Sequence, residues 1–211
     1  MDKKFDTFSV PLGLLDYVNP ILYAITVVTV IRNTYSPMVA PYNRLMLIGA
    51  AISVFFGLII PTGKVLVGLG IIKFVMPVSL VFSVNAGILL FGLTLLRFVL
   101  DVSGAIWLVL IAVIVFTLTA IYRKTKKLNT VAVLTGAAGY LLTYISLIAL
   151  SLRYGVMLPI VLYALAIGLF IFLCGVGIKA DLYDPKVHWV IEISNVVCQL
   201  FVAIATVLLF R

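Results

Sequence analysis

VHWVIEISNVVCQLFVAIATVLLF, residues 187–210 of the chain, is long and apolar enough to cross a lipid bilayer as one helix. Such a crossing takes about 20 residues, because inside lipid a helix satisfies its backbone polar groups within the segment. Polar side chains nevertheless recur in this stretch at His188, Glu192, Asn195 and Gln199. Their spacing places them within roughly 60° of one another around the helix. The stretch therefore predicts a transmembrane helix with a polar ribbon along one side.

Six further stretches have a similar length and composition, and turn-forming or charged residues separate them. Together they predict seven spans, at about 11–31, 45–61, 75–98, 102–122, 130–152, 156–178 and 187–210. Hydrophobic residues make up 64% of the chain and charged residues 10%, whereas soluble domains run at about 45–50% and about 25%. We therefore expect an all-α integral membrane protein, with residues 1–211 folded as a single seven-transmembrane-helix bundle.

The segment PTGKVLVGLGIIKFVMP, residues 61–77, is the least regular part of this pattern. It holds three Gly, two Pro and two Lys between the second and third predicted spans. Three interpretations stay open for it: a short interfacial helix, a re-entrant turn, or an extension of the third helix. Irregular backbone at membrane depth is tolerated only against protein or water.

Basic residues are distributed unevenly over the two sides of the predicted membrane. Ten of the fifteen Lys and Arg residues fall on the side of the N-terminus and five on the other side. Basic loops remain in the cytoplasm, so we expect a cytoplasmic N-terminus and an outer C-terminus in a bacterial or archaeal plasma membrane. The formal net charge of +8 fits contact with anionic lipid headgroups in the bilayer and does not call for nucleic acid as a partner.

Small residues four positions apart predict which helices pack most closely, because helix association in lipid depends on close backbone approach. Three stripes of this kind occur in the second, third and fifth predicted spans: Gly49, Ser53 and Gly57; Ser79, Ser83 and Gly87; Thr135, Gly139 and Thr143. Two other features are expected to be structural. Arg97 and Asp101, four apart, predict a local surface ion pair, and Trp107 is expected to anchor the chain at the membrane interface.

Ionisable groups inside a span are costly, so they mark candidate functional sites. Glu192 and His188 are the only glutamate and the only histidine of the chain. Further polar residues of the first and third spans fall at overlapping depths. Lys73 is either the partner of a buried Glu192 or a lysine whose side chain reaches the lipid headgroups. The predicted binding residues are Glu192, His188, Asn195, Gln199, Asp16, Asn19, Lys73 and Asn85.

These residues favour a polar pocket that opens toward the cytoplasm and is lined by the first, third and seventh helices. The leading hypothesis is that this pocket binds or translocates a small polar solute or an ion, without a cofactor. Neither catalysis nor its absence follows from the sequence. A third hypothesis is a non-catalytic subunit or sensor domain whose polar ribbon faces a second copy or a partner subunit in the membrane.

The alternative is a membrane-embedded lipid hydrolase. Such an enzyme would use a metal ion bound by His188, Glu192 and Asp184. HWVIE, residues 188–192, is similar in position and spacing to the HxxxH on the last helix of the seven-helix membrane hydrolases that include alkaline ceramidases. Glu192 stands in place of their second histidine, and the histidine and aspartate on their earlier helices have no clear match. The resemblance covers two residues and implies metal-dependent hydrolysis only to that extent.

Overall fold

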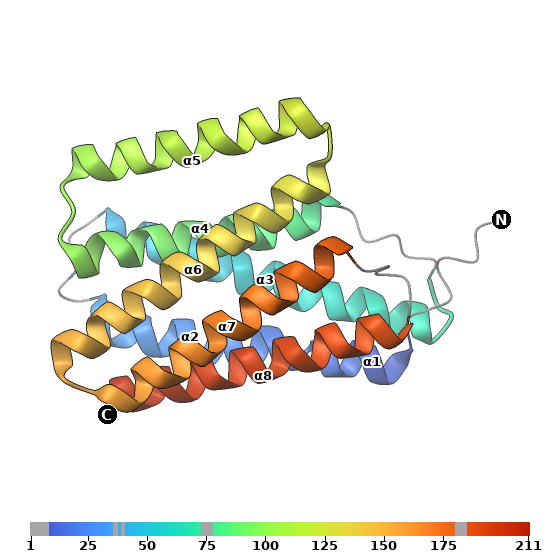
Figure 1. Ribbon diagram of the computed structural model, residues 1–211. Helices are drawn as coiled ribbons and strands as arrows, with labels where there is room; N and C mark the ends of the chain where they lie inside the picture. The colour runs from blue at the N-terminus through green and yellow to red at the C-terminus, as the bar shows by residue number, and fades with distance from the viewer. Residues whose placement is uncertain (1–8, 36–37, 39–40, 73–77, 180–184) are drawn as a thin grey trace.

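The computed structural model describes residues 9–35, 38, 41–72, 78–179 and 185–211, and these residues form helices without any strand (Figure 1). Seven helical segments of the described chain are long and apolar enough to cross a membrane, which confirms a polytopic helical bundle. The helices are α1 Val10–Asp16, α2 Val18–Thr34, α3 Tyr42–Gly68, α4 Val78–Leu100, α5 Gly104–Thr125, α6 Leu128–Tyr154, α7 Met157–Lys179 and α8 Pro185–Leu209. Helices α1 and α2 share the first span. Which end of the bundle faces the cytoplasm stays a prediction.

The first span is divided between Asp16 and Val18, and Pro20 accounts for the division. Proline has no backbone N–H, so the carbonyl of Asp16 lacks the donor that residue i+4 normally supplies. The regular pattern resumes one residue later, where the N–H of Ile21 donates to the carbonyl of Tyr17 at 3.3 Å. The break therefore lies beside Asp16, the carboxylate of this span.

Helix α3 shows that the expectations for the segment after the second span were wrong. The helix continues through Pro61 to Gly68, so residues 61–68 extend the second span and form neither an interfacial helix, a re-entrant turn nor part of the third helix. Pro61 is buried, and packed neighbours permit a proline within a membrane helix. Lys64 consequently lies on a transmembrane helix. Without Lys64, more Lys and Arg residues are still predicted on the side of the N-terminus than on the other side.

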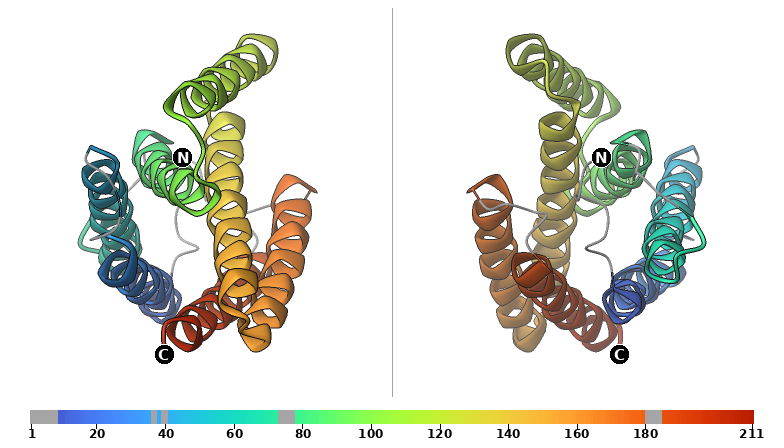
Figure 2. Two further views of the ribbon diagram at one scale, coloured as in Figure 1. Left: turned by 90° about the vertical axis from the view of Figure 1, so that its left-hand side faces the viewer. Right: turned by 90° about the vertical axis from the view of Figure 1, so that its right-hand side faces the viewer.

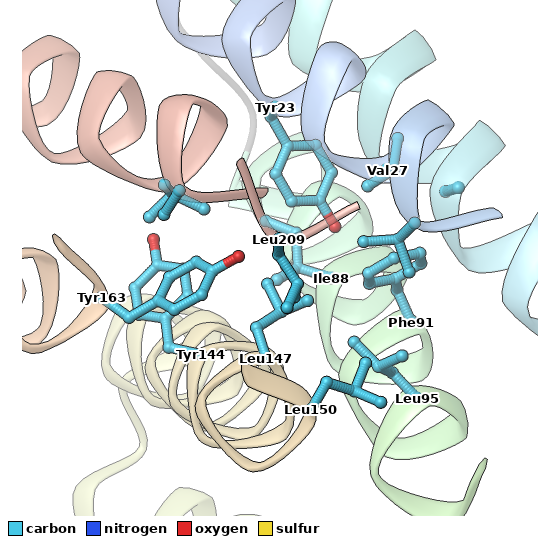
Figure 3. Packing of buried hydrophobic residues seen from close by; sticks show 14 of the residues in the cluster. Tyr23, Val27, Ile88, Phe91, Leu95, Tyr144, Leu147, Leu150, Tyr163 and Leu209 are labelled. Carbon is cyan, nitrogen blue, oxygen red and sulfur yellow. The ribbon is translucent and has the colours of Figure 1, made fainter. Parts of the chain in front are cut away.

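Helices α3, α4 and α6 pack closely through their glycines, as the small-residue stripes predict. A Cβ added at Gly49 would lie 2.8 Å from the carbonyl oxygen of Gly87, and one at Gly139 would lie 2.5 Å from the backbone nitrogen of Leu89. The α4 stripe packs only at its Gly87 end, because Ser79 is exposed. Figure 3 shows the apolar core that results, in which tyrosines of α2, α6 and α7 lie among leucines and Phe91.

Helix α5 lies outside the group formed by the other helices (Figure 2). Trp107 is its one buried residue, and its indole N–H donates to the carbonyl of Leu93 on α4 at 3.1 Å. Its ring also meets that of Tyr42 edge to face, with centroids 5.3 Å apart. The prediction of an interface anchor is therefore wrong for Trp107, which attaches α5 to the bundle instead.

Candidate functional site

Two carboxylates and one ammonium meet inside the bundle. Nζ of Lys64 on α3 lies 2.7 Å from Oδ2 of Asp16 on α1 and 2.7 Å from Oε1 of Glu192 on α8. The exposed fractions of the three side chains are 6%, 11% and 7%, in that order. Lys64 therefore takes the place that the sequence assigned to Lys73, which lies outside the described residues. We call Asp16, Lys64, Glu192, His188 and Asn19 the charged cluster.

His188 and Asn19 complete this cluster. Nε2 of His188, one turn before Glu192, lies 3.3 Å from Oε1 of Glu192 and 3.3 Å from Nζ of Lys64. The amide nitrogen of Asn19 donates to Oε2 of Glu192 at 3.2 Å and to Oδ1 of Asp16 at 3.3 Å. Asn19 thus bridges the two carboxyl groups on the side away from the lysine.

The charges of the cluster are not balanced by its described side chains alone when both carboxyl groups are ionised. Asp16 and Glu192 then contribute two negative charges, and Lys64 contributes one positive charge. An uncompensated charge is expensive in a medium of low dielectric constant. A proton on His188 or on a carboxyl group, a cation nearby, or a group outside the described residues would supply the missing positive charge. The cluster is therefore suited to holding a proton or a cation.

A cavity of about 210 Å³ adjoins the cluster. All helices except α5 contribute to its lining: Asp16, Asn19, Pro20, Tyr23, Ser53, Gly57, Ile60, Val84, Ile88, Tyr140, Phe170, Asn195, Cys198 and Gln199. Asp16 and Asn19 belong to both the cluster and this lining, so the cluster forms one wall of the cavity.

Two amide oxygens in the lining have no hydrogen-bond donor among the described residues. They are Oδ1 of Asn19 and Oε1 of Gln199, and both are buried. The nitrogen of the Gln199 amide, by contrast, lies 3.5 Å from the hydroxyl of Tyr144. Buried polar atoms without a partner are uncommon, and one explanation is a ligand or water that the site normally holds. Both amides therefore offer acceptors to whatever enters the cavity.

The structure gathers most of the residues that the sequence singled out. Four of them line the cavity (Asp16, Asn19, Asn195 and Gln199), and Glu192 and His188 lie in the cluster beside it. Asn85 does not join them, because its amide nitrogen donates to the carbonyl of Ala132 on α6 at 2.8 Å and so links two helices.

The proposed metal site is only partly covered by the described residues. No group of three His, Cys, Asp or Glu side chains within the described ranges could hold a metal ion. Asp184, the third suggested ligand, lies outside those ranges. Metal binding by His188, Glu192 and Asp184 therefore stays a prediction.

Among the residues of the site that were missed from the sequence are Lys64, Tyr23 and Tyr140. A signal for Lys64 was present, because it follows Gly57 by seven residues, which is close to two helical turns of about 3.6 residues each. It therefore shares the face of the small-residue stripe on α3. Tyr23 and Tyr140 carried no such signal, since a tyrosine in an apolar helix is compatible with core, interface or site.

Comparisons of the chain with protein-family models, with curated proteins and with solved structures found no match. Fold and site alone therefore define the class. The chain is a polytopic helical membrane protein with a charged cluster and a polar cavity within its bundle.

Proposed function

We propose that the cavity binds a small polar solute or ion that carries hydrogen-bond donors or a positive charge. The observation that carries this proposal is the adjacency of the Asp16–Lys64–Glu192 cluster to a cavity with two unpartnered amide oxygens. Buried ionisable groups in membrane proteins commonly mark the paths of ions and substrates.

The chemistry of the lining favours a donor over an acceptor as ligand. Asn19 and Gln199 offer carbonyl oxygens, and Asp16 offers a carboxylate. Tyr23 and Tyr140 line the same space. The face of a tyrosine ring attracts cations, and the buried hydroxyl of Tyr23, also without a partner among the described residues, offers one more oxygen. A small amine or an inorganic cation matches this combination better than an anion does.

The size of the cavity supports a small solute. Pockets for drug-sized ligands run to about 300–1,000 Å³, so about 210 Å³ suits a molecule of only a few heavy atoms rather than a whole lipid. Hydrolysis could use the Ser53 hydroxyl in the lining as a nucleophile, but this hydroxyl already donates to the carbonyls of Gly49 and Ala50 on its own helix. We therefore place solute binding ahead of lipid hydrolysis.

The subunit hypothesis needs the polar ribbon of α8 on the outside of the bundle. Glu192 and Gln199 are instead 5% and 7% exposed, and Asn195 lines the cavity. This orientation supports a ligand within the bundle over a protein partner at its surface.

Thermal unfolding of the purified full chain in detergent tests the proposal. The probes are Na⁺, K⁺, ammonium, methylammonium and glycine, each titrated at constant ionic strength. A ligand that binds only the folded state raises the melting temperature as its concentration rises. We expect at least one probe to do so, and we expect Gln199→Leu to remove most of the rise, because it deletes an acceptor of the cavity. Flat titrations with all five probes would contradict the proposal.

Asn85→Ala provides the matched control. It also removes an amide, a half-buried one that joins α4 to α6 outside the cavity lining. We expect it to lower the melting temperature of the free protein and to leave the ligand-induced rise intact. Equal loss of the rise in Asn85→Ala and Gln199→Leu would show that the rise reports general stability and not occupancy of the cavity.

Proton release gives an independent readout. If a cation takes over the compensation of the negative cluster, the proton that compensated it before is released. We expect the responding cation to acidify a weakly buffered solution of the wild type, as a pH-sensitive dye would report. Glu192→Gln removes one negative charge from the cluster, so we expect less release from that variant. An unchanged proton yield would separate the cluster from ligand binding.

A further inference from the structure

A second cavity, of about 250 Å³, lies at the opposite end of the bundle from the charged cluster. Arg97 in the last turn of α4 and Arg153 near the end of α6 both line it, together with Asp101 and Tyr42. Arginines outnumber carboxylates in this lining, so the cavity carries a positive excess. Its chemistry is the reverse of that of the first cavity.

The guanidinium of Arg97 stacks on the aromatic ring of Tyr42 and is not paired with a carboxylate of the described residues. Its Cζ atom lies 3.5 Å from the centre of the Tyr42 ring, and that ring is supported edge to face by Trp107. A guanidinium that stacks by its face keeps its N–H groups, which lie in its plane, for other partners. The buried Nε of Arg97 has no hydrogen-bond partner among the described residues.

The ion pair expected between Arg97 and Asp101 is not formed. Both residues are described, and neither forms an ion pair with the other; the salt bridges of the charged cluster lie at the opposite end of the bundle. Asp101 instead adopts a left-handed backbone conformation with φ of 48° just after α4 ends. Asp101 therefore does not pair with Arg97, and the positive charge of the cavity remains available to attract an anion.

The distribution of arginine and lysine over the sequence points to the same end. Of the six arginines, five lie at this end of the helices, at positions 32, 44, 97, 153 and 211. The lysines of the described residues all lie toward the other end. Arginine binds phosphate through two parallel N–H donors, whereas lysine offers a point charge. The ends of membrane helices are also the level at which lipid headgroups lie.

We propose that Arg97 and Arg153 form a binding site for a phosphate group at this end of the bundle. The phosphate belongs either to a phospholipid headgroup or to a free anion, and the two sources share the same recognition by guanidinium. Tyr42 fixes the plane of Arg97, and Asp101 limits the affinity. This site is independent of the solute cavity, since the two linings have no residue in common.

Calorimetric titration of the full chain in a neutral, lipid-free detergent tests the proposal with three probes: inorganic phosphate, a short-chain phosphatidic acid, and the diacylglycerol with the same chains. We expect the phosphatidic acid to bind and the diacylglycerol not to bind. If inorganic phosphate also binds by itself, the site accepts a soluble anion; if it does not, the lipid is the source. Absence of binding by both phosphate-bearing probes overturns the proposal.

Variants locate the binding. Arg97→Gln and Arg153→Gln are each expected to weaken binding at least about tenfold, because each removes a charged hydrogen-bond donor. Arg97→Lys keeps the charge but loses the stacked, planar fork, and we expect it to weaken binding as well while melting like the wild type. Arg32→Gln is the matched control, since Arg32 is an exposed arginine at the same end outside the cavity lining. An equal loss in Arg32→Gln would assign binding to diffuse surface charge and overturn the site.

Discussion

The two ends of the bundle differ in how their charged side chains are paired. At one end Lys64 lies between Asp16 and Glu192, and each charged atom has an oppositely charged neighbour at 2.7 Å. At the other end Arg97 stacks on Tyr42, and no carboxylate of the described residues pairs with it. The first arrangement joins three helices to one another, whereas the second leaves its cation available to an outside group.

This difference separates charges that hold the fold from charges that await a ligand. Deleting one member of a buried, paired set leaves its partners uncompensated, which is costly for stability. Deleting a cation that has no protein partner mainly affects what it would bind. Stability and binding measurements on matched substitutions at the two ends therefore test this difference.

The largest effect is expected for Lys64→Met compared with Arg153→Gln. Lys64→Met leaves Asp16 and Glu192 facing each other without a cation, so we expect a loss of about 3–5 kcal/mol in the free energy of unfolding. Arg153 is exposed, and its substitution is expected to change that free energy by less than about 0.5 kcal/mol. Reversible denaturation in mixed micelles measures both. Similar losses at the two ends would refute the distinction.

The cluster itself provides a control for this prediction. Adding Asp16→Asn and Glu192→Gln to Lys64→Met removes all three charges, and neutral replacement of a buried ionic set is often close to neutral in stability. We expect the triple variant to recover most of the loss of the single variant. If it does not, packing of the lysine stem and not charge explains the effect.

A second pair of matched substitutions replaces one glycine at each end of the bundle by alanine. A Cβ at Gly13 would lie 2.9 Å from the backbone nitrogen of Val65, so Gly13→Ala must push α1 from α3 beside Lys64. At Gly104 the nearest atom would be the Tyr42 hydroxyl at an ordinary 3.4 Å. We expect Gly13→Ala to destabilise by about 1–3 kcal/mol and Gly104→Ala to be neutral or slightly stabilising. Thermal unfolding compares them, and a harmless Gly13→Ala would contradict the close approach.

Salt should act on the two ends differently. The charged cluster is buried, and buried pairs are screened weakly. We therefore expect the difference in stability between wild type and Lys64→Met to remain constant as NaCl is raised. Binding of the short-chain phosphatidic acid should weaken over the same range, because Arg153 and Asp101 are exposed. Affinity that is insensitive to salt would indicate that the lipid is held by its acyl chains.

The smallest effect is expected for Asp101→Asn. Asparagine also tolerates the left-handed backbone found at this position, so the fold should be unchanged. Removing the negative charge should tighten phosphatidic acid binding by about two- to fivefold at low salt, in line with the modest energies of exposed ion pairs. The same titration measures it, and weaker binding would show that Asp101 organises the site instead of opposing the anion.

The sequence predicted the spans because apolar length alone decides whether a helix can cross lipid. It also singled out most of the polar residues that the structure brings together at the candidate site, since Glu192, Asn195 and Gln199 share a helix face whatever surrounds them. The partner of Glu192 could not be predicted in the same way. Pro61 and the glycines around Lys64 suggested that the second span ends before them, whereas α3 continues to Gly68.

The arginine cavity escaped prediction for a related reason. A spacing of four residues between Arg97 and Asp101 suggests an ion pair if the helix continues, but α4 ends at Leu100 and the backbone turns. Tyr42, which binds the face of Arg97 instead, comes from a helix more than fifty residues earlier in the chain. Contacts of such sequence separation leave no trace in local spacing.

Pro20 and Pro61 have a mechanical consequence. Each removes one hydrogen bond from its helix, and the pieces beyond them are joined to each other: Gly13 packs on Val65, and the hydroxyl of Tyr17 lies 2.6 Å from that of Thr62. Helix α1 and the last turns of α3 are therefore joined to each other on the far side of both prolines. A displacement of this joined piece would move Asp16 and Lys64 together and would change their contacts with Glu192 on α8 and with Asn19 on α2.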